Sequence, residues 1–150
     1  MKNEWCSASA RILCAQHDQL RQTIKTTHAA ARSVLAASGA AGVLQAAVVA
    51  LSDQLLVHLD DEERLLEPIL AARDAWGPMR AALLRAEHAH QRAVLALLRG
   101  PTAWPAGPLV ARRALVLCDD LVADMDFEER ELLGEKPVRD GVLPLDASDA

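Results

Sequence analysis

Apolar residues recur at alternating spacings of three and four along four long stretches of this chain. That spacing is typical of amphipathic helices that pack one face into a core. We expect helices over about residues 7–37, 43–75, 78–99 and 108–133. Pro68 lies inside the second stretch and removes a backbone hydrogen-bond donor, so we expect a kink there. Because no stretch shows the two-residue alternation of a strand, the sequence predicts an all-α protein.

Glycine and proline residues mark the breaks between these stretches. Ser38-Gly39-Ala-Ala-Gly42 ends the first stretch and offers a glycine for a left-handed cap. Trp76-Gly77-Pro78 separates the second stretch from the third, and a loop rich in Pro and Gly, residues 100–107, precedes the fourth. Long helices with short connections favour an up-down-up-down four-helix bundle.

We assign residues 1–134 to the bundle and residues 135–150 to an irregular tail. Pro137 and Pro144 interrupt this tail, and it has no helical period. We expect its apolar residues to pack back onto the bundle: Val138, Val142, Leu143 and Leu145.

Length and composition narrow the functional class. A chain of 150 residues suits one domain, and the net charge of −5 gives no reason to expect nucleic acid as a partner. The start lacks a secretory apolar segment, and we interpret the uncharged run from Ser33 to Ser52 as two helix ends joined by a turn. We therefore expect a cytoplasmic protein with no membrane partner. The sequence carries no signal of oligomeric state.

Each of the four apolar stripes contains polar residues that a core would ordinarily exclude. A buried carboxylate is costly unless it is paired or binds a metal. His58 and Glu62 are four residues apart and project from the same helix face, so their nitrogen and oxygen atoms form a ready pair of metal ligands. The full set of candidate ligands is His17, His58, Glu62, His88, Asp124 and Glu128.

These candidates need to lie at one level of the bundle. Counted from the turns, His17 matches His58 and Glu62 in depth, and His88 matches Glu62 within roughly 6 Å at about 1.5 Å of rise per residue. His28 is too far along the first helix to join them, and His90 points away from His88. The convergent set predicts a metal site, with a metal-free polar network as the alternative.

The pattern resembles the hemerythrin-like, or HHE cation-binding, family over residues of about 7–134. The most specific piece is His58-x-x-x-Glu62-Glu63-x-x-Leu66-x-Pro68, which is similar to the second-helix motif of that family. Gln16-His17 and Glu87-His88 resemble its other helix histidines. Asp124-Met-Asp-Phe-Glu128-Glu129-Arg130 resembles its fourth helix, and it also parallels the second helix of this chain.

The resemblance implies a di-iron centre inside the bundle, with histidines and bridging carboxylates as ligands. It implies binding or sensing of dioxygen, nitric oxide or iron. Two positions depart from the family pattern: Asp124 stands where the family has histidine, and Arg92 stands where many members have a further histidine. Asp124 still offers oxygen to a hard metal. We expect Arg92 either to repel metal or to neutralise Glu62 or Asp124 in an empty site.

Three functions follow from this interpretation. We favour a non-catalytic protein that binds iron, as one or two ions, with dioxygen or another small diatomic molecule as its partner. A different metal, partial occupancy and an empty site stay open. The second function is a metal-free bundle with a structural or protein-interaction role, and the third is an enzyme that uses an open di-metal site. The stripes hold no separate nucleophile or base, so the sequence favours a protein that is not an enzyme.

Overall fold

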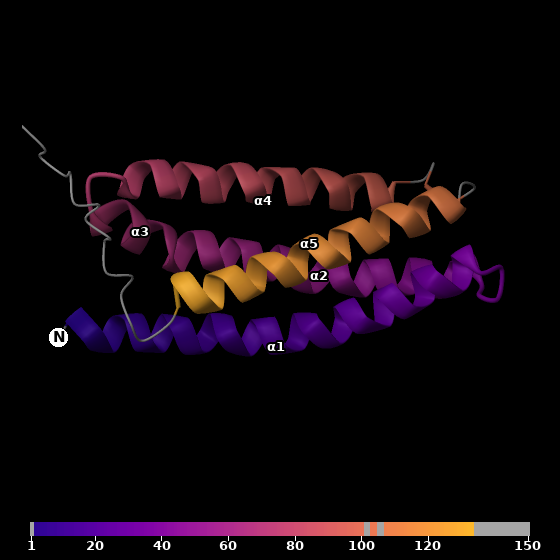
Figure 1. Ribbon diagram of the computed structural model, residues 1–150, viewed down its shortest axis with the longest axis horizontal. Coiled ribbons are helices and arrows are strands. Elements are labelled where there is room, and N and C mark those ends of the chain that lie inside the picture. Colours follow the sequence, from indigo (N-terminus) through magenta and orange to yellow (C-terminus); the bar gives the residue numbers. More distant parts are fainter. Residues whose placement is uncertain (1, 101–102, 105–106, 134–150) are drawn as a thin grey trace, which may run out of the picture.

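The structure, a computed structural model, describes residues 2–100, 103–104 and 107–133. Its helices are α1 (Lys2–Leu35), α2 (Ala41–Leu65), α3 (Glu67–Arg73), α4 (Gly77–Arg99) and α5 (Gly107–Glu131). α3 continues the course of α2 after a break, so the two form one rod (Figure 1). Four rods thus run up, down, up and down, and the described residues contain no strand. The predicted all-α four-helix bundle is confirmed.

The second rod breaks at the place where a kink was expected. α2 ends at Leu65, and Pro68 lies in the first turn of α3. A proline ring clashes with the carbonyl group four residues earlier, so a regular helix does not continue through this point. The backbone N–H of Leu66 still donates to the carbonyl oxygen of Glu62 at 2.7 Å. The break therefore comes directly after the turn that carries Glu62.

The turn between α1 and α2 has a different cap from the one predicted. The residue in the left-handed region is Ala37, with φ of 54°, so the expectation of a glycine there is wrong. The backbone N–H groups of Ser38 and Gly39 both donate to the carbonyl oxygen of Ser33, which closes the turn around Ala37. A Cβ atom on Gly39 would lie 2.6 Å from the Cβ atom of Ser33. Glycine is thus needed at position 39 for close approach.

The predicted stripes form the core. Buried leucines from α1, α2, α4 and α5 make one large cluster, which includes Leu20, Leu55, Leu59, Leu95 and Leu121. A smaller cluster at the α3 end of the bundle is built on Leu13, Leu66 and Leu70. His17 falls between Leu13 and Leu20 in sequence, and Glu62 falls between Leu59 and Leu66. The polar stripe residues therefore occupy a layer between two apolar layers.

One stretch, Ala41–Arg73, is long and apolar enough to cross a membrane by length and composition alone. In this structure it is the α2–α3 rod, and 44% of its most apolar window is buried inside the bundle. A core helix passes the same test. The tail residues expected to pack back onto the bundle lie outside the described residues.

Candidate metal centre

The predicted ligands on the first three rods are among the most buried polar residues of the described chain. The exposed fractions are 0% for His17, 3% for His58, 1% for Glu62 and 2% for His88. Asp124 and Glu128 on α5 are partly buried, and the side chain of Glu128 is 12% exposed. His28, in contrast, has a side chain that is 36% exposed, and His90 is exposed. Both lie apart from the buried layer, as expected.

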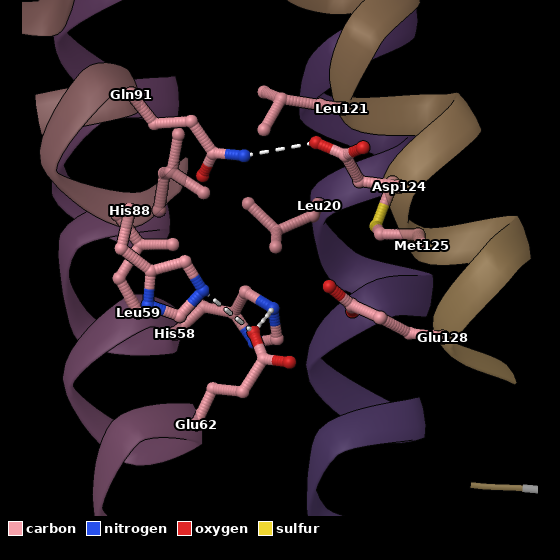
Figure 2. A pocket seen from close by; sticks show the side chains of 11 residues that line it. Leu20, His58, Leu59, Glu62, His88, Gln91, Leu121, Asp124, Met125 and Glu128 are labelled. Atoms are coloured by element: carbon pink, nitrogen blue, oxygen red, sulfur yellow. Dashed lines mark hydrogen bonds and ion pairs between the residues drawn. The ribbon is translucent and has the colours of Figure 1, made fainter. Parts of the chain in front are cut away.

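Glu62 lies at the middle of this layer. Its Oε2 atom is 3.4 Å from Nε2 of His58 and 3.3 Å from Nε2 of His88. Figure 2 shows both imidazole rings directed at this carboxylate, with Glu128 approaching from α5. Three separate rods thus contribute to one cluster.

A second grouping joins α1, α2 and α5. The Nε2 atom of His17 lies 3.2 Å from Oε2 of Glu128. One potential ligand atom from each of His17, His58 and Glu128 lies within 4.8 Å of the others, which is close enough for one ion to contact all three. Among the predicted ligands, Asp124 belongs to neither grouping. Its carboxylate accepts a hydrogen bond from Nε2 of Gln91 at 2.9 Å.

The Nδ1 atom of each buried histidine lies within hydrogen-bond distance of a side-chain oxygen atom. The Nδ1 atom of His17 is 2.9 Å from Oε1 of Glu129, and that of His88 is 3.0 Å from Oε1 of Glu63. The Nδ1 atom of His58 is 2.9 Å from the amide oxygen of Gln16. Carboxylate and amide oxygens only accept hydrogen bonds, so each Nδ1 must carry the proton. In the neutral imidazole the Nε2 lone pair then points into the centre of the bundle.

This arrangement suits a cation. Inside the bundle each Nε2 lone pair faces a carboxylate oxygen at 3.2 to 3.4 Å, and two acceptors in contact repel unless a proton or a metal ion lies between them. Nε2 of His17 and Oε1 of Glu62 are buried without a hydrogen-bond partner of acceptable geometry. A small cavity of about 10 Å³ lies beside Glu62, His88 and Glu128, and its size suits one water molecule or one ion.

Two arginines complete the outer layer with the same geometry. Arg21 donates to Oε1 of Glu129 at 2.7 Å and to Asp126 at 2.8 Å. Arg92 donates to Oε1 of Glu63 at 2.7 Å and to Asp60 at 2.8 Å. These hydrogen bonds hold the pKa values of Glu129 and Glu63 below their usual range.

The expectation that Arg92 neutralises Glu62 or Asp124 is therefore wrong, because its partners are Glu63 and Asp60. Its guanidinium group lies outside the buried layer, with 31% of the side chain exposed, and its charge is matched by Glu63 and Asp60. Arg92 supports the carboxylate that orients His88, as Arg21 does for His17.

The comparison with known families agrees with this geometry. The family model described as Hemerythrin HHE cation binding domain matches residues 9–135. The chain belongs to the hemerythrin HHE cation-binding family. In the comparisons with curated proteins and with solved structures, nothing matches significantly. The family assignment supports cation binding by this bundle.

The protonation of the hemerythrin-like centre follows from its packing. Burial disfavours the charged form of His17 and of His88, but the neighbouring carboxylates outweigh burial and raise both pKa values. Burial lowers the pKa of His58 to about 4, and the nearby positive charge of His17 acts in the same direction. Burial also raises the pKa of Glu128. A bound cation would replace the protons shared by these groups, so its binding releases protons.

Burial of Asp124 makes the ionised form of its carboxyl group unfavourable. Burial raises the pKa of its carboxyl group to about 6, and the charges of Glu87 and Glu128 add to the effect. At neutral pH and without metal, this carboxylate is held ionised in a negative, partly dry environment. A cation would relieve that cost.

Replacing Asp124 by Asn is expected to stabilise the metal-free protein at neutral pH. The folded-state pKa lies above the unfolded value of 3.8, so the stability contribution of Asp124 is largest below that value and is lost as pH rises through about 6. Allowing for partial exposure, we expect Asp124→Asn to raise the free energy of unfolding by about 1 to 2 kcal/mol at about pH 7.5. Urea unfolding of chelated protein measures this difference. A gain that does not shrink as pH is lowered toward about 4 would contradict the assignment.

The roles of the outer residues Glu63, Glu129, Arg21 and Arg92 were not predicted, although the sequence contains two patterns that mark them. Glu62-Glu63 and Glu128-Glu129 are paired acids in which one faces inward and the next faces outward. The spacing His17-x-x-x-Arg21 recurs as His88-x-x-x-Arg92. Repeated spacing on helices that the bundle places opposite each other indicates that these arginines have equivalent roles.

Proposed function

We propose that this hemerythrin-like protein binds iron through His17, His58, Glu62, His88, Asp124 and Glu128, and acts in the cytoplasm. The observation that carries the proposal is the set of three Nε2 lone pairs that face carboxylate oxygens inside the bundle. We propose further that the iron binds dioxygen or another small diatomic molecule, for transport, sensing or iron handling.

The donor set favours iron. Three imidazoles and three carboxylates mix borderline nitrogen ligands with hard oxygen ligands, and soft sulfur ligands are absent from this set. Cys118, the buried cysteine, lies elsewhere in the core, where burial raises the pKa of its thiol to about 12. Five of the six candidates fall into two groupings, one at His17, His58 and Glu128 and one at Glu62 and His88. This division supports a centre of one or two ions.

The residues of the chain bind the metal and orient the side chains that hold it. Iron, when bound, supplies the position at which a diatomic molecule attaches. Gln16, Glu63 and Glu129 fix the direction of each imidazole ring, and Arg21 and Arg92 fix the two glutamates. The leucine layers on both sides keep water from His17, His58 and Glu62, which strengthens their interaction with a cation. The centre includes no serine or cysteine nucleophile, so we propose a binding role and not a catalytic one.

Anaerobic titration of the chelated protein with Fe(II) tests this proposal. We expect saturation at a defined number of ions per chain. His58→Ala is expected to weaken binding at least about tenfold, because it removes a buried ligand. His90→Ala is a matched control, since His90 is exposed and contacts none of the candidates. Equal titration curves for His58→Ala and the unaltered protein would contradict the ligand assignment.

A second candidate function is a metal-free bundle with a structural or protein-interaction role. The inner groups also pair with one another, as His17 does with Glu128 and His88 does with Glu62, so shared protons are able to hold the layer together without metal. The effect of a chelator on stability separates the two functions.

A further inference from the structure

At three of the four contacts between neighbouring rods, hydrogen bonds join a buried histidine to outer side chains. We call each such set of hydrogen-bonded residues a polar clamp. The α1–α5 clamp runs from His17 to Glu129 and Arg21. The α2–α4 clamp runs from His88 to Glu63 and Arg92. The α1–α2 clamp runs from His58 through Gln16 to Asp61. Each clamp links its two helices by hydrogen bonds.

The α4–α5 contact departs from this pattern at every equivalent position. The parallel between α2 and α5 places Asp124 where α2 has His58, and Phe127 where α2 has Asp61. The parallel between α1 and α4 places Glu87 where α1 has Gln16. A phenyl ring cannot accept the hydrogen bond that Asp61 accepts, and two carboxylates do not bond each other. A clamp built on a histidine therefore does not form here. The helices are joined instead by the hydrogen bond from Nε2 of Gln91 to Asp124, and 51% of Phe127 is exposed.

A cleft of about 530 Å³ opens at this contact, as far as the described residues define it. Its outer walls come from α3, α4 and the end of α5 and are mostly apolar, with Leu70, Leu83, Leu84, Phe127 and Leu132. The charged residues Arg73, Arg80, Glu87 and Glu131 also line the cleft. Its inner end is formed by His88, Gln91, Asp124 and Glu128, which also line the small cavity beside Glu62. This volume lies in the range of small-molecule sites, which combine apolar walls with a few convergent polar groups.

The inner end of the cleft offers hydrogen-bond acceptors. Gln91 is only 5% exposed, its Nε2 group already donates to Asp124, and its Oε1 atom has no partner (Figure 2). The carboxylate of Asp124 lies beside it, and that of Glu128 lines the same cleft. A buried acceptor without a donor destabilises the protein, so a ligand that donates a hydrogen bond here would remove that cost.

We infer that the α4–α5 cleft binds a small molecule with a ring-sized apolar body and a hydroxyl head that donates to Oε1 of Gln91. The apolar body lies against Leu83 and Phe127, and the hydroxyl lies next to the metal centre. An ammonium head would also donate, but a cation bound by His88 and Glu62 repels it. The choice of a hydroxyl over an ammonium head rests on the proposed function, whereas binding in the cleft itself rests on the apolar walls and Gln91.

Titration with benzyl alcohol and with anisole, followed by ligand-observed NMR, tests this inference. The two probes are isomers, and only benzyl alcohol has an O–H donor. We expect saturable binding of benzyl alcohol, about tenfold tighter than that of anisole, which corresponds to one hydrogen bond. Equal affinity for the two probes, or no saturable binding of benzyl alcohol, would overturn the inference.

Two leucines on α4 provide a matched pair of variants. Leu83 is 63% exposed and lines the cleft, whereas Leu97 is 60% exposed and does not line it. Leu83→Glu is expected to weaken benzyl alcohol binding at least about tenfold and Leu97→Glu to leave it unchanged, because only the first places a charge against the apolar body.

Metal content and molar mass of the same samples distinguish a ligand-binding cleft from an effect on the metal centre or on a dimer. Iron content is expected to be equal in both variants, so loss of alcohol binding and loss of metal are scored independently. A second copy of the chain is the competing occupant of the cleft. Dissociation of a dimer by Leu83→Glu but not by Leu97→Glu, seen in light scattering, would assign the cleft to that copy and overturn the inference.

Discussion

Replacing Glu62 by Gln is expected to lower the iron content of the purified protein at least about tenfold. Changes to residues that merely orient metal ligands typically cost 10–100-fold in affinity, and Glu62 is closer to the centre than those residues. Its carboxylate is 1% exposed and lies within 3.4 Å of both His58 and His88. Glutamine has nearly the same volume, so the bundle is expected to fold. Elemental analysis of the purified variant measures the change.

Asp53→Asn is the matched control for this variant. Asp53 lies on the same helix, is 64% exposed and pairs with Arg99 at 3.2 Å, an interaction of little energetic weight. Its iron content is expected to equal that of the unaltered protein. If Glu62→Gln keeps its iron and shows an unchanged circular dichroism spectrum, Glu62 is not a ligand and the iron is bound elsewhere.

Removal of metal by a chelator is expected to lower the melting temperature by roughly 8–16 °C. A ligand present at about 1,000 times its dissociation constant stabilises the folded state by about 4 kcal/mol. In a chain of this size, each kcal/mol corresponds to about 2–4 °C. Differential scanning calorimetry with and without chelator measures the shift, and restoring Fe(II) is expected to reverse it.

An unchanged melting temperature would favour the metal-free bundle instead. In that case the pairs His17–Glu128 and His88–Glu62 hold the layer together through shared protons. Asp124→Asn provides a second criterion. It is expected to stabilise the chelated protein and to weaken iron binding, whereas a purely structural role predicts the same stabilisation with and without Fe(II).

The parts of the fold that could be predicted from the sequence depend on local periodicity. His58 and Glu62 share a helix face because they are four residues apart, and both are buried as that spacing predicts. Pro68 breaks the second rod because its ring and missing donor act within one turn. The position of each stripe in the core follows from the same periodicity.

The features that could not be predicted depend on how neighbouring helices are placed. The cap of α1 falls on Ala37 because Gly39 is required for close contact with Ser33, and the positions of the glycines in the sequence do not reveal that choice. The partner of Arg92 is Glu63 and not Glu62, which depends on how α2 is rotated against α4. The cleft at Phe127 becomes visible only when the four helix contacts are compared with one another.

Metal analysis combined with the visible absorption spectrum of the protein, purified from cells supplied with ample iron, tests the central claim most directly. The account predicts at least about one iron ion per chain, retained through purification because its ligands are buried. It predicts that the visible absorption disappears on chelation. Protein that is free of metal under these conditions, and that takes up no Fe(II) when it is offered, would contradict the claim that these histidines and carboxylates form a metal centre.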